Sequence, residues 1–221
     1  CFSVGLMKTL SILNKKNLHG LKLAKKVIFF EQKIMKEVVG SQDQIASSIG
    51  GFNKIKFLKN DKFIINRIPK KNLNNLNSNL MLLFTGIQRK AHNIAKNYVN
   101  KLSNKKEKNV LKIMKFVDVA ERLILNNDLH NFGRLMNEAW QEKKLLSKAI
   151  TNNKIDNLYN YALRNGALGG KLLGAGGGGF LLFYVPKEKQ LGLSRKLKNL
   201  IHIPFRFSYQ GSHEILNTVR K

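Results

Sequence analysis

A run of closely spaced glycines at residues 174–179 is the stretch of this sequence best suited to unusual chemistry, because Gly176, Gly177, Gly178 and Gly179 follow one another directly. Every glycine loses more backbone freedom on folding than other residues do, so a simple turn does not need four of them. Such a run indicates that another backbone, or a polyanionic ligand, comes closer than a Cβ atom would permit. We therefore take these four glycines and Gly174 as candidate binding residues.

The glycine run is similar to two familiar nucleotide-binding motifs, but neither motif fits its sequence context. Gly174, Gly176 and Gly179 satisfy the dinucleotide pattern G-x-G-x-x-G. That loop follows a strand and opens a helix, so that the pyrophosphate meets helix-terminal amides, whereas we expect a helix at 155–165 before the run and a strand at 180–185 after it. The P-loop pattern also fails, because the Gly-Lys pair before the run is followed by leucine instead of serine or threonine.

The sequence gives little support for a zinc site, a disulfide or a membrane-spanning helix. The five histidines lack the spacing of a zinc site, and the single cysteine, Cys1, cannot form an internal disulfide, which favours a reducing, cytoplasmic setting. No apolar run approaches the roughly 18 residues that a membrane helix needs. We therefore expect no membrane association.

The charge balance is strongly basic, with 40 Lys and Arg against 13 Asp and Glu, a formal net charge of +27. Such a balance could serve nucleic-acid binding, because lysines that pair with phosphates release counterions. The lysines are, however, spread along the chain beside abundant Asn and Ile, as AT-biased coding would produce, and the basic pairs are not interleaved with aromatic residues. We expect no specific nucleic-acid partner, and keep a basic nucleic-acid-binding module as the alternative of a different class.

The elements that must position the candidate residues form a mixture of helices and strands. The 221 residues suffice for one or two domains with a sizeable core. Apolar periodicity predicts an α+β fold without regular strand-helix alternation. The Asn-rich stretch at 72–78 is the expected boundary between domains 1–78 and 79–221. The expected helices are 1–13, 21–39, 41–49, 88–102, 106–126, 128–150 and 155–165, and the expected strands are 53–57, 63–68, 79–85, 180–185 and 205–209.

Asp43 lies in the first turn of the short helix that glycines bracket at 40 and at 50–51. A carboxylate there is stabilised by the helix dipole, which would by itself explain its presence. On the residues alone, this structural explanation is the commoner one.

The sequence GALGGKLLGAGGGGFLLF at 166–183 resembles the third conserved motif of the small-molecule kinase superfamily that includes galactokinase, homoserine kinase and mevalonate kinase, the GHMP kinases. Within that superfamily the chain is similar to the D-glycero-D-manno-heptose 7-phosphate kinases. Further segments match in order along nearly the whole chain, at 1–10, 37–57, 82–96, 138–156 and 204–216.

The resemblance implies that the chain is N-terminally truncated. Residues 1–10 resemble the tail of the superfamily's second motif, whose phosphate-holding loop would lie just before Cys1. Family members continue upstream for about a further domain's length. We therefore expect a two-lobed fold with part of the N-terminal lobe missing and a ferredoxin-like C-terminal lobe, and we expect these residues alone to be inactive.

The resemblance also implies roles for single residues. Asp43 matches the catalytic aspartate that accepts or orients the proton of the attacking hydroxyl, a role that contributes about 10²- to 10⁴-fold. Glu31 lies where the superfamily carries an acidic Mg²⁺ ligand, with Glu37 as the alternative. ATP is the implied cofactor, and Gly174 and Gly176–Gly179 are expected to border its phosphates.

The implied acceptor is a sugar phosphate, which calls for a cation near its phosphate. Thr85, Gly86 and Arg89 follow a buried strand where family members contact substrate, and the planar guanidinium of Arg89 suits bidentate phosphate binding. Lys90 and Lys171 are the competing candidates.

The implied reaction is transfer of the γ-phosphoryl group of MgATP to the anomeric hydroxyl of D-glycero-D-manno-heptose 7-phosphate, for nucleotide-activated heptose and surface polysaccharide synthesis. A fucose or galactose kinase of the same superfamily is the alternative enzyme. The sequence carries no signal of the oligomeric state.

Overall fold

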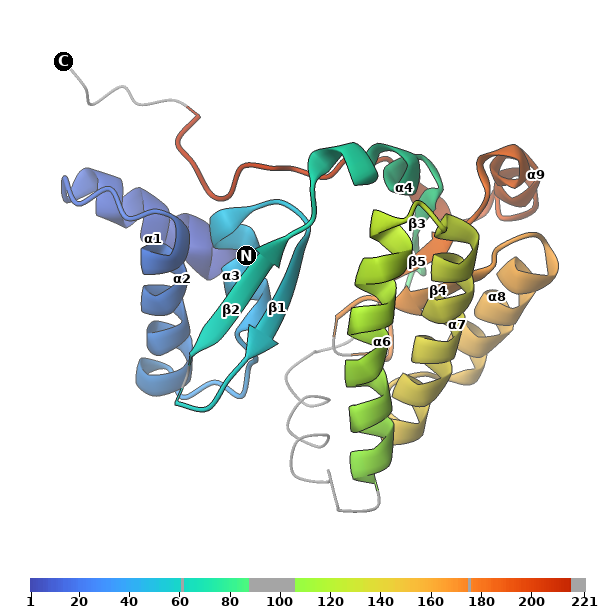
Figure 1. Cartoon of the computed structure of the whole chain (residues 1–221), viewed down its shortest axis with the longest axis horizontal. Helices are drawn as coiled ribbons and strands as arrows, with labels where there is room; N and C mark the ends of the chain where they lie inside the picture. The colour runs from blue at the N-terminus through green and yellow to red at the C-terminus, as the bar shows by residue number, and fades with distance from the viewer. Residues whose placement is uncertain (61, 88–105, 175, 216–221) are drawn as a thin grey trace. The chain divides into compact units, whose positions relative to one another are not determined.

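The computed structural model describes residues 1–60, 62–87, 106–174 and 176–215 and divides the chain into two compact units (Figure 1). The first unit comprises Cys1–Ile68 and the chain from Phe207 onward, and the second comprises Pro69–Arg206. This division differs from the expected one at 78, because the Asn-rich stretch is folded into the second unit. It carries the short helices η2 (Lys70–Asn72) and α4 (Asn74–Ser78), and its two leucines at 73 and 76 are fully buried.

The first unit consists of helices followed by a two-stranded antiparallel sheet. Its small core joins Val4 on the first helix to Leu23 and Val27 on the second. The elements are α1 (Phe2–Leu13), α2 (Gly20–Phe29), the π-helix η1 (Phe30–Ile34), α3 (Gln42–Ile49), β1 (Asn53–Phe57) and β2 (Phe63–Arg67).

The helix expected at 21–39 is shorter than its apolar pattern suggested. It widens after Phe29 into η1, where the amide of Met35 donates to the carbonyl of Phe30 at 2.9 Å. Lys36 then adopts a positive φ of 55°, a conformation that stops a right-handed helix. Apolar spacing carries no information about either event.

The second unit is built on one four-stranded sheet with the strand order β4-β5-β3-β6, in which every neighbouring pair is antiparallel. Among the described residues, three helices lie between β3 and β4 and one lies between β5 and β6. This order and these directions are those of a ferredoxin-like sheet, so the expected C-terminal architecture is confirmed. The elements are β3 (Leu80–Phe84), α6 (Glu107–Leu125), α7 (Leu129–Leu146), α8 (Asn153–Arg164), β4 (Gly169–Leu172), β5 (Phe180–Tyr184), α9 (Lys187–Lys196) and β6 (Ile201–Ile203).

Two strand predictions need correction. Strand β4 occupies the first part of the glycine-rich segment, where glycines mask the β pattern, so the glycine run joins two strands instead of a helix and a strand. In the described part of the chain the last strand is β6, and residues 205–209 form no strand. Apolar and polar residues alternate in that segment as in a strand, but from Phe207 onward it belongs to the first unit. There the ring of Phe207 packs edge-on against that of Phe52, with 5.3 Å between the ring centroids. The helix expected at 88–102 lies outside the described residues.

An aromatic series fastens the helices to the sheet. The ring of Trp140 on α7 lies 5.9 Å from that of Tyr159 on α8, which in turn lies 5.4 Å from that of Phe183 on β5. All three side chains are buried, and offset aromatic pairs at such distances are favourable. Helix α6 packs against α7, and α7 meets α8 through the pair of Trp140 and Tyr159 (Figure 1).

Side-chain caps fix where α7 and α8 begin. A carboxylate oxygen of Asp128 accepts from the amide of Asn131, and Oδ1 of Asn152 accepts from the amide of Ile155 at 3.1 Å. Asp and Asn are favoured N-cap residues for this reason, and the two helices begin within two residues of the expected starts at 128 and 155. In the described parts of the chain, no helix is long and apolar enough to span a membrane.

Candidate functional site

Asp43 lies in the first turn of α3, as the bracketing glycines predicted, and its side chain is exposed. The helix ends at Gly50, whose φ of 63° suits glycine and whose amide donates to the carbonyl of Ala46 at 2.9 Å. The carboxylate of Asp43 is thus held at the open end of a short, well-terminated helix.

A hydrogen bond links the helix of Asp43 to Glu31. Gln44, the residue after Asp43, is 5% exposed and donates through Nε2 to Oε2 of Glu31 on η1. Helix α3 also packs against α2, which continues into η1. The two carboxylates that the sequence nominated therefore sit on neighbouring elements, joined through Gln44, a contact that sequence reasoning missed.

The carboxylate of Glu31 fits one ligand position of a magnesium ion, although it is not a complete site. Its side chain is half-buried and one oxygen, Oε2, receives the amide of Gln44. Within residues 1–60, 62–87, 106–174 and 176–215, no group of three or more metal-ligating side chains comes together. Mg²⁺ commonly takes one or two carboxylates and completes its shell with water and substrate phosphates, so Glu31 suits an ion that arrives with a nucleotide.

The C-terminal segment of the chain closes against the other end of α3. The amide of Gly51 donates to the carbonyl of Ser208 at 2.7 Å, and the amide of Ser212 donates to the carbonyl of Ser47 at 2.8 Å. A Cβ on Gly211 would lie 2.0 Å from the carbonyl oxygen of Ser48. The helix that carries Asp43 is therefore fixed by residues about 160 positions later in the chain, which no local pattern could predict.

In the second unit the glycine run is clamped between two backbone segments. A Cβ on Gly176 would lie 2.8 Å from the backbone of Ile150, and one on Gly178 would lie 2.4 Å from the carbonyl oxygen of Ile87. Gly177 and Gly179 donate their amides to the same two carbonyls, each at 2.9 Å. The glycine run predicted that another backbone or a ligand comes close to it, and the structure shows the backbones of Ile87 and Ile150 there. Contact of the run with ATP phosphates stays a prediction.

The predicted substrate residues after β3 also bind this run. The hydroxyl of Thr85 donates to the carbonyl of Gly179 at 2.8 Å, and the amide of Thr85 donates to the same oxygen at 2.9 Å. Gly86 follows with a φ of 71°. Arg89 and Lys90 lie outside the described residues, so the structure brings only Thr85 and Gly86 of that group to the glycine run.

A test of the clamp is the Gly178→Ala variant, in which the new methyl group would collide with a backbone carbonyl. We expect the amide protons of Gly179 and Thr85 to exchange at least about tenfold faster, because separating the segments opens their hydrogen bonds. Gly192→Ala is the matched control, since the φ of Gly192 is not positive and a Cβ there meets nothing within 4 Å. Equal exchange in the two variants would contradict the clamp, and hydrogen exchange read by NMR measures it.

Two lysines flank the run near its beginning. Lys171 is exposed on β4, and Lys143 on α7 donates through Nζ to the carbonyl of Gly174 at 3.4 Å. Burial, with a smaller contribution from the charge of Lys171, lowers the pKa of Lys143 to about 8. The sequence nominated Lys171 and missed Lys143, because burial cannot be seen in a chain so rich in lysine.

The lowered pKa predicts how stability changes with pH. Below pH 8 Lys143 is charged in both the folded and the unfolded chain, so the folded state bears the full penalty of burying the charge. Between about 8 and the usual 10.5 the folded state has released the proton and the unfolded state has not, so stability rises with pH. Lys143→Met should therefore stabilise the protein most at pH 7, and its advantage should shrink by pH 10.

Chemical unfolding of both proteins across this pH range measures the effect, with the exposed Lys198→Met as the control. A difference between Lys143→Met and the wild-type chain that is independent of pH would contradict the lowered pKa.

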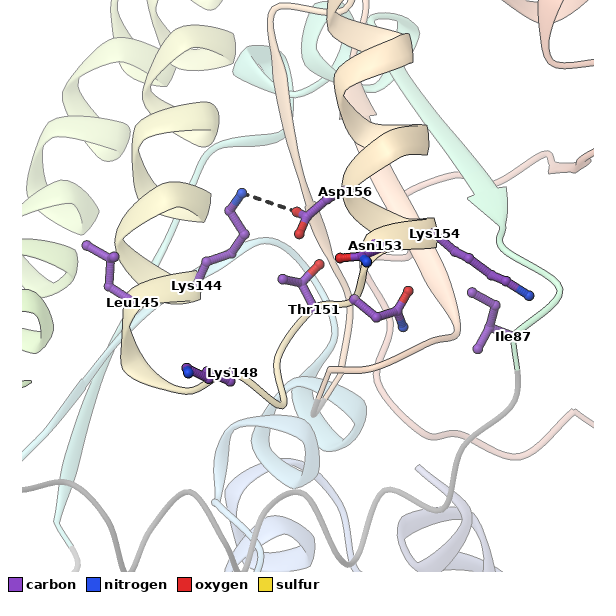
Figure 2. A pocket seen from close by; sticks show the side chains of 9 residues that line it. Ile87, Lys144, Leu145, Lys148, Thr151, Asn153, Lys154 and Asp156 are labelled. Carbon is purple, nitrogen blue, oxygen red and sulfur yellow. Dashed lines mark hydrogen bonds and ion pairs between the residues drawn. The ribbon is translucent and has the colours of Figure 1, made fainter.

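A cavity of about 820 Å³ opens beside the glycine run, where α7 ends and α8 begins (Figure 2). Its lining is mostly polar and basic and comes wholly from the second unit. The lining residues are Ile87, Lys144, Leu145, Lys148, Thr151, Asn152, Asn153, Lys154 and Asp156.

Comparison with known proteins identifies the second unit. Residues 120–201 match the family profile described as GHMP kinases C terminal. This part of the chain is therefore similar to the C-terminal domain of the GHMP kinases, and the resemblance predicted from its glycine run is confirmed.

Two individual relatives that match most of this chain are sugar kinases. The chain is 30% identical over 198 residues to the D-glycero-alpha-D-manno-heptose 7-phosphate kinase of Campylobacter jejuni, a match that covers 88% of this chain and 58% of that protein. It is 28% identical to the bifunctional fucokinase/GDP-fucose pyrophosphorylase of Arabidopsis thaliana, covering 80% of this chain and 17% of that protein.

A solved structure shares the fold across both units. The crystal structure of a sugar kinase from Campylobacter jejuni superposes with a TM-score of 0.73 at 27% identity, covering 95% of this chain and 61% of that one. The chain thus spans about 60% of the length of the two Campylobacter jejuni proteins.

Proposed function

We propose that this chain is part of an ATP-dependent kinase that phosphorylates a sugar phosphate, and specifically the anomeric hydroxyl of D-glycero-D-manno-heptose 7-phosphate. The observation that carries the proposal is the 30% identity to a heptose 7-phosphate kinase over 88% of the chain. The paired placement of Asp43 and Glu31 on elements joined through Gln44 supports it. The product would enter nucleotide-activated heptose and surface polysaccharide synthesis.

In this proposal Asp43 is the general base. An exposed carboxylate at the first turn of α3 is open to a substrate hydroxyl, and accepting its proton makes a poor nucleophile reactive. The neighbouring amide of Gln44 and the C-terminal residues at 208–212 hold the helix in place, and phosphoryl transfer depends strongly on such positioning.

The glycine run and Thr85 have a supporting role in the same proposal. Thr85 and the glycines at 174–179 border the nucleotide, and their mutual hydrogen bonds keep that border rigid. Gly86, Arg89 and Lys171 are proposed to face the sugar phosphate. When bound, MgATP supplies the γ-phosphoryl group, with its charge neutralised by the metal.

Glu31 is proposed to provide the protein ligand for Mg²⁺, which gives a direct test. Glu31→Gln keeps an oxygen that can accept the amide of Gln44 but removes the negative charge. We expect the full-length gene product to need at least about tenfold more Mg²⁺ for half-maximal turnover, because a neutral amide is a weaker ligand for a hard cation.

Glu37→Gln is the matched control, because the amide of Glu37 bonds to the carbonyl of Glu31 and its side chain belongs to the same short segment. An unchanged Mg²⁺ requirement in Glu31→Gln, or the larger shift in Glu37→Gln, would assign the metal ligand elsewhere.

A fucose kinase of the same superfamily is the second candidate, favoured by the match to the plant fucokinase at 28% identity. The two candidates differ in whether the acceptor already carries a phosphate. Turnover of fucose with no turnover of heptose 7-phosphate would select the second. We place either reaction in the cytoplasm, where ATP is available and the exposed free thiol of Cys1 would stay reduced.

A further inference from the structure

We propose that the cavity between α7 and α8 is a subsite for a phosphate monoester, and that it holds the phosphate group that the acceptor sugar already carries. The assignment to the acceptor rests on the proposed function. The anion site itself rests only on residues of the second unit.

The charge of the lining favours an anion. Lys144, Lys148 and Lys154 supply three ammonium groups, and Asp156 is the one carboxylate among the nine described residues that line the cavity. Asp156 is neutralised by Lys144, whose Nζ lies 3.2 Å from Oδ1. Figure 2 shows this pair on one side, with Lys148 on the connection after α7 and Lys154 on the first turn of α8. Lys148 and Lys154 have no acidic partner among the described residues, so these two cations can receive a ligand.

Polar groups at the start of α8 add to the attraction. Thr151, Asn152 and Asn153 form the entry to a helix of 12 residues, whose first amides carry partial positive charge. The hydroxyl oxygen of Thr151 is buried, and in the described structure it has no hydrogen-bond partner. A buried hydroxyl without a partner is costly, and a phosphate oxygen in the cavity would satisfy it.

The cavity borders the glycine run through shared hydrogen bonds. Nδ2 of Asn152 donates to the carbonyl of Gly177 at 3.2 Å, and the amide of Gly179 donates to the carbonyl of Ile87, which also lines the cavity. A ligand in the cavity would thus lie beside the segment proposed to border the nucleotide, where an acceptor has to be.

The cavity has a lining that favours a sugar phosphate over a nucleotide. Its 820 Å³ falls within the range of about 300–1,000 Å³ usual for small-molecule sites. The nine residues that line it in the described structure include no aromatic ring on which a base could stack. Lys171, nominated from the sequence for the same phosphate, is not among them.

The experiment measures binding of inorganic phosphate and of heptose 7-phosphate to the 221-residue chain by calorimetry at constant ionic strength. We compare the Lys148→Met/Lys154→Met double variant with Lys187→Met/Lys198→Met, which removes the same charge from exposed positions outside the cavity. We expect the first pair to weaken binding of both ligands at least about tenfold, and the second pair to change it less than about twofold.

Three outcomes would overturn the subsite. The first is an equal loss of phosphate binding in both double variants, which would indicate general charge attraction. The second is no loss of binding in either double variant. The third is no phosphate binding by the wild-type chain at millimolar concentration. A Lys148→Arg/Lys154→Arg variant that restores binding would support it, because it returns the charge without returning the native side chains.

Kinetics of the full-length gene product separate this inference from the proposed function. A raised KM for heptose 7-phosphate with an unchanged KM for ATP supports the assignment to the acceptor. A raised KM for ATP instead overturns that assignment. Lysine-dependent phosphate binding in a protein without kinase activity would leave the anion site standing and remove the proposed function alone.

Discussion

The Asp43→Asn variant of the full-length gene product should lose at least about 99% of its turnover while its ATP affinity stays nearly unchanged. Asparagine keeps the size of the side chain and its place in the first turn of α3, but it cannot accept the proton of the attacking hydroxyl. Removal of a general base costs about 10²- to 10⁴-fold, so the effect falls on kcat. Single-turnover kinetics with titrated ATP measure both quantities.

Asp128→Asn is the matched control for this change. Asp128 caps α7 through its carboxylate, and asparagine is an equally good N-cap residue, so the same chemical substitution should leave turnover unchanged. If Asp43→Asn keeps more than about a tenth of the wild-type rate, Asp43 is a structural helix residue and not the base.

The Gly169→Ala variant should destabilise the second unit more than any other single methyl group considered above. A Cβ on Gly169 would lie 2.1 Å from the carbonyl oxygen of Gly133 and 2.6 Å from the amide nitrogen of Asn137, both in the backbone of α7. Neither atom can rotate away, so the helix must move off β4. Overpacking of this kind costs roughly 1–3 kcal/mol, which differential scanning calorimetry would show as a lower Tm.

The same substitution at Gly192 should raise the stability of the second unit instead of lowering it. Gly192 lies inside α9, and a Cβ there meets nothing within 4 Å. Alanine in an open helix position should stabilise by about 0.5–1 kcal/mol because it has less backbone freedom to lose. A Gly169→Ala variant as stable as Gly192→Ala would show that α7 and β4 are not in backbone contact.

Much of the fold could be predicted from the sequence because its signals are local. The apolar run at 80–84 and the alternation at 53–57 predicted strands, and apolar periodicity predicted the starts of α7 and α8 to within two residues. Strand β4 escaped because its glycines have no side chains to form a pattern. The return of Phe207 to the first unit escaped because it depends on contacts with residues far away in the chain.

The candidate site divides in the same way. The glycine run predicted that another group lies very close to its backbone. The structure shows that this group is the backbone at Ile87 and at Ile150. Charge could not single out Lys148 or Lys154 among 40 basic residues, since only the folded chain shows that they share a cavity with Thr151. The link between Gln44 and Glu31 likewise needs the packing of α3 on α2.

The most direct test of the proposed kinase is ATP-dependent phosphorylation by the full-length gene product, with heptose 7-phosphate, fucose and galactose offered separately and the products identified by mass spectrometry and ³¹P NMR. We expect a heptose 1,7-bisphosphate, formed with a kcat/KM at least about a hundredfold above that for either unphosphorylated sugar, since a site with buried groups for a phosphate strongly rejects an acceptor that lacks it. Faster turnover of fucose or galactose, or no phosphorylation of the heptose phosphate, would contradict the account.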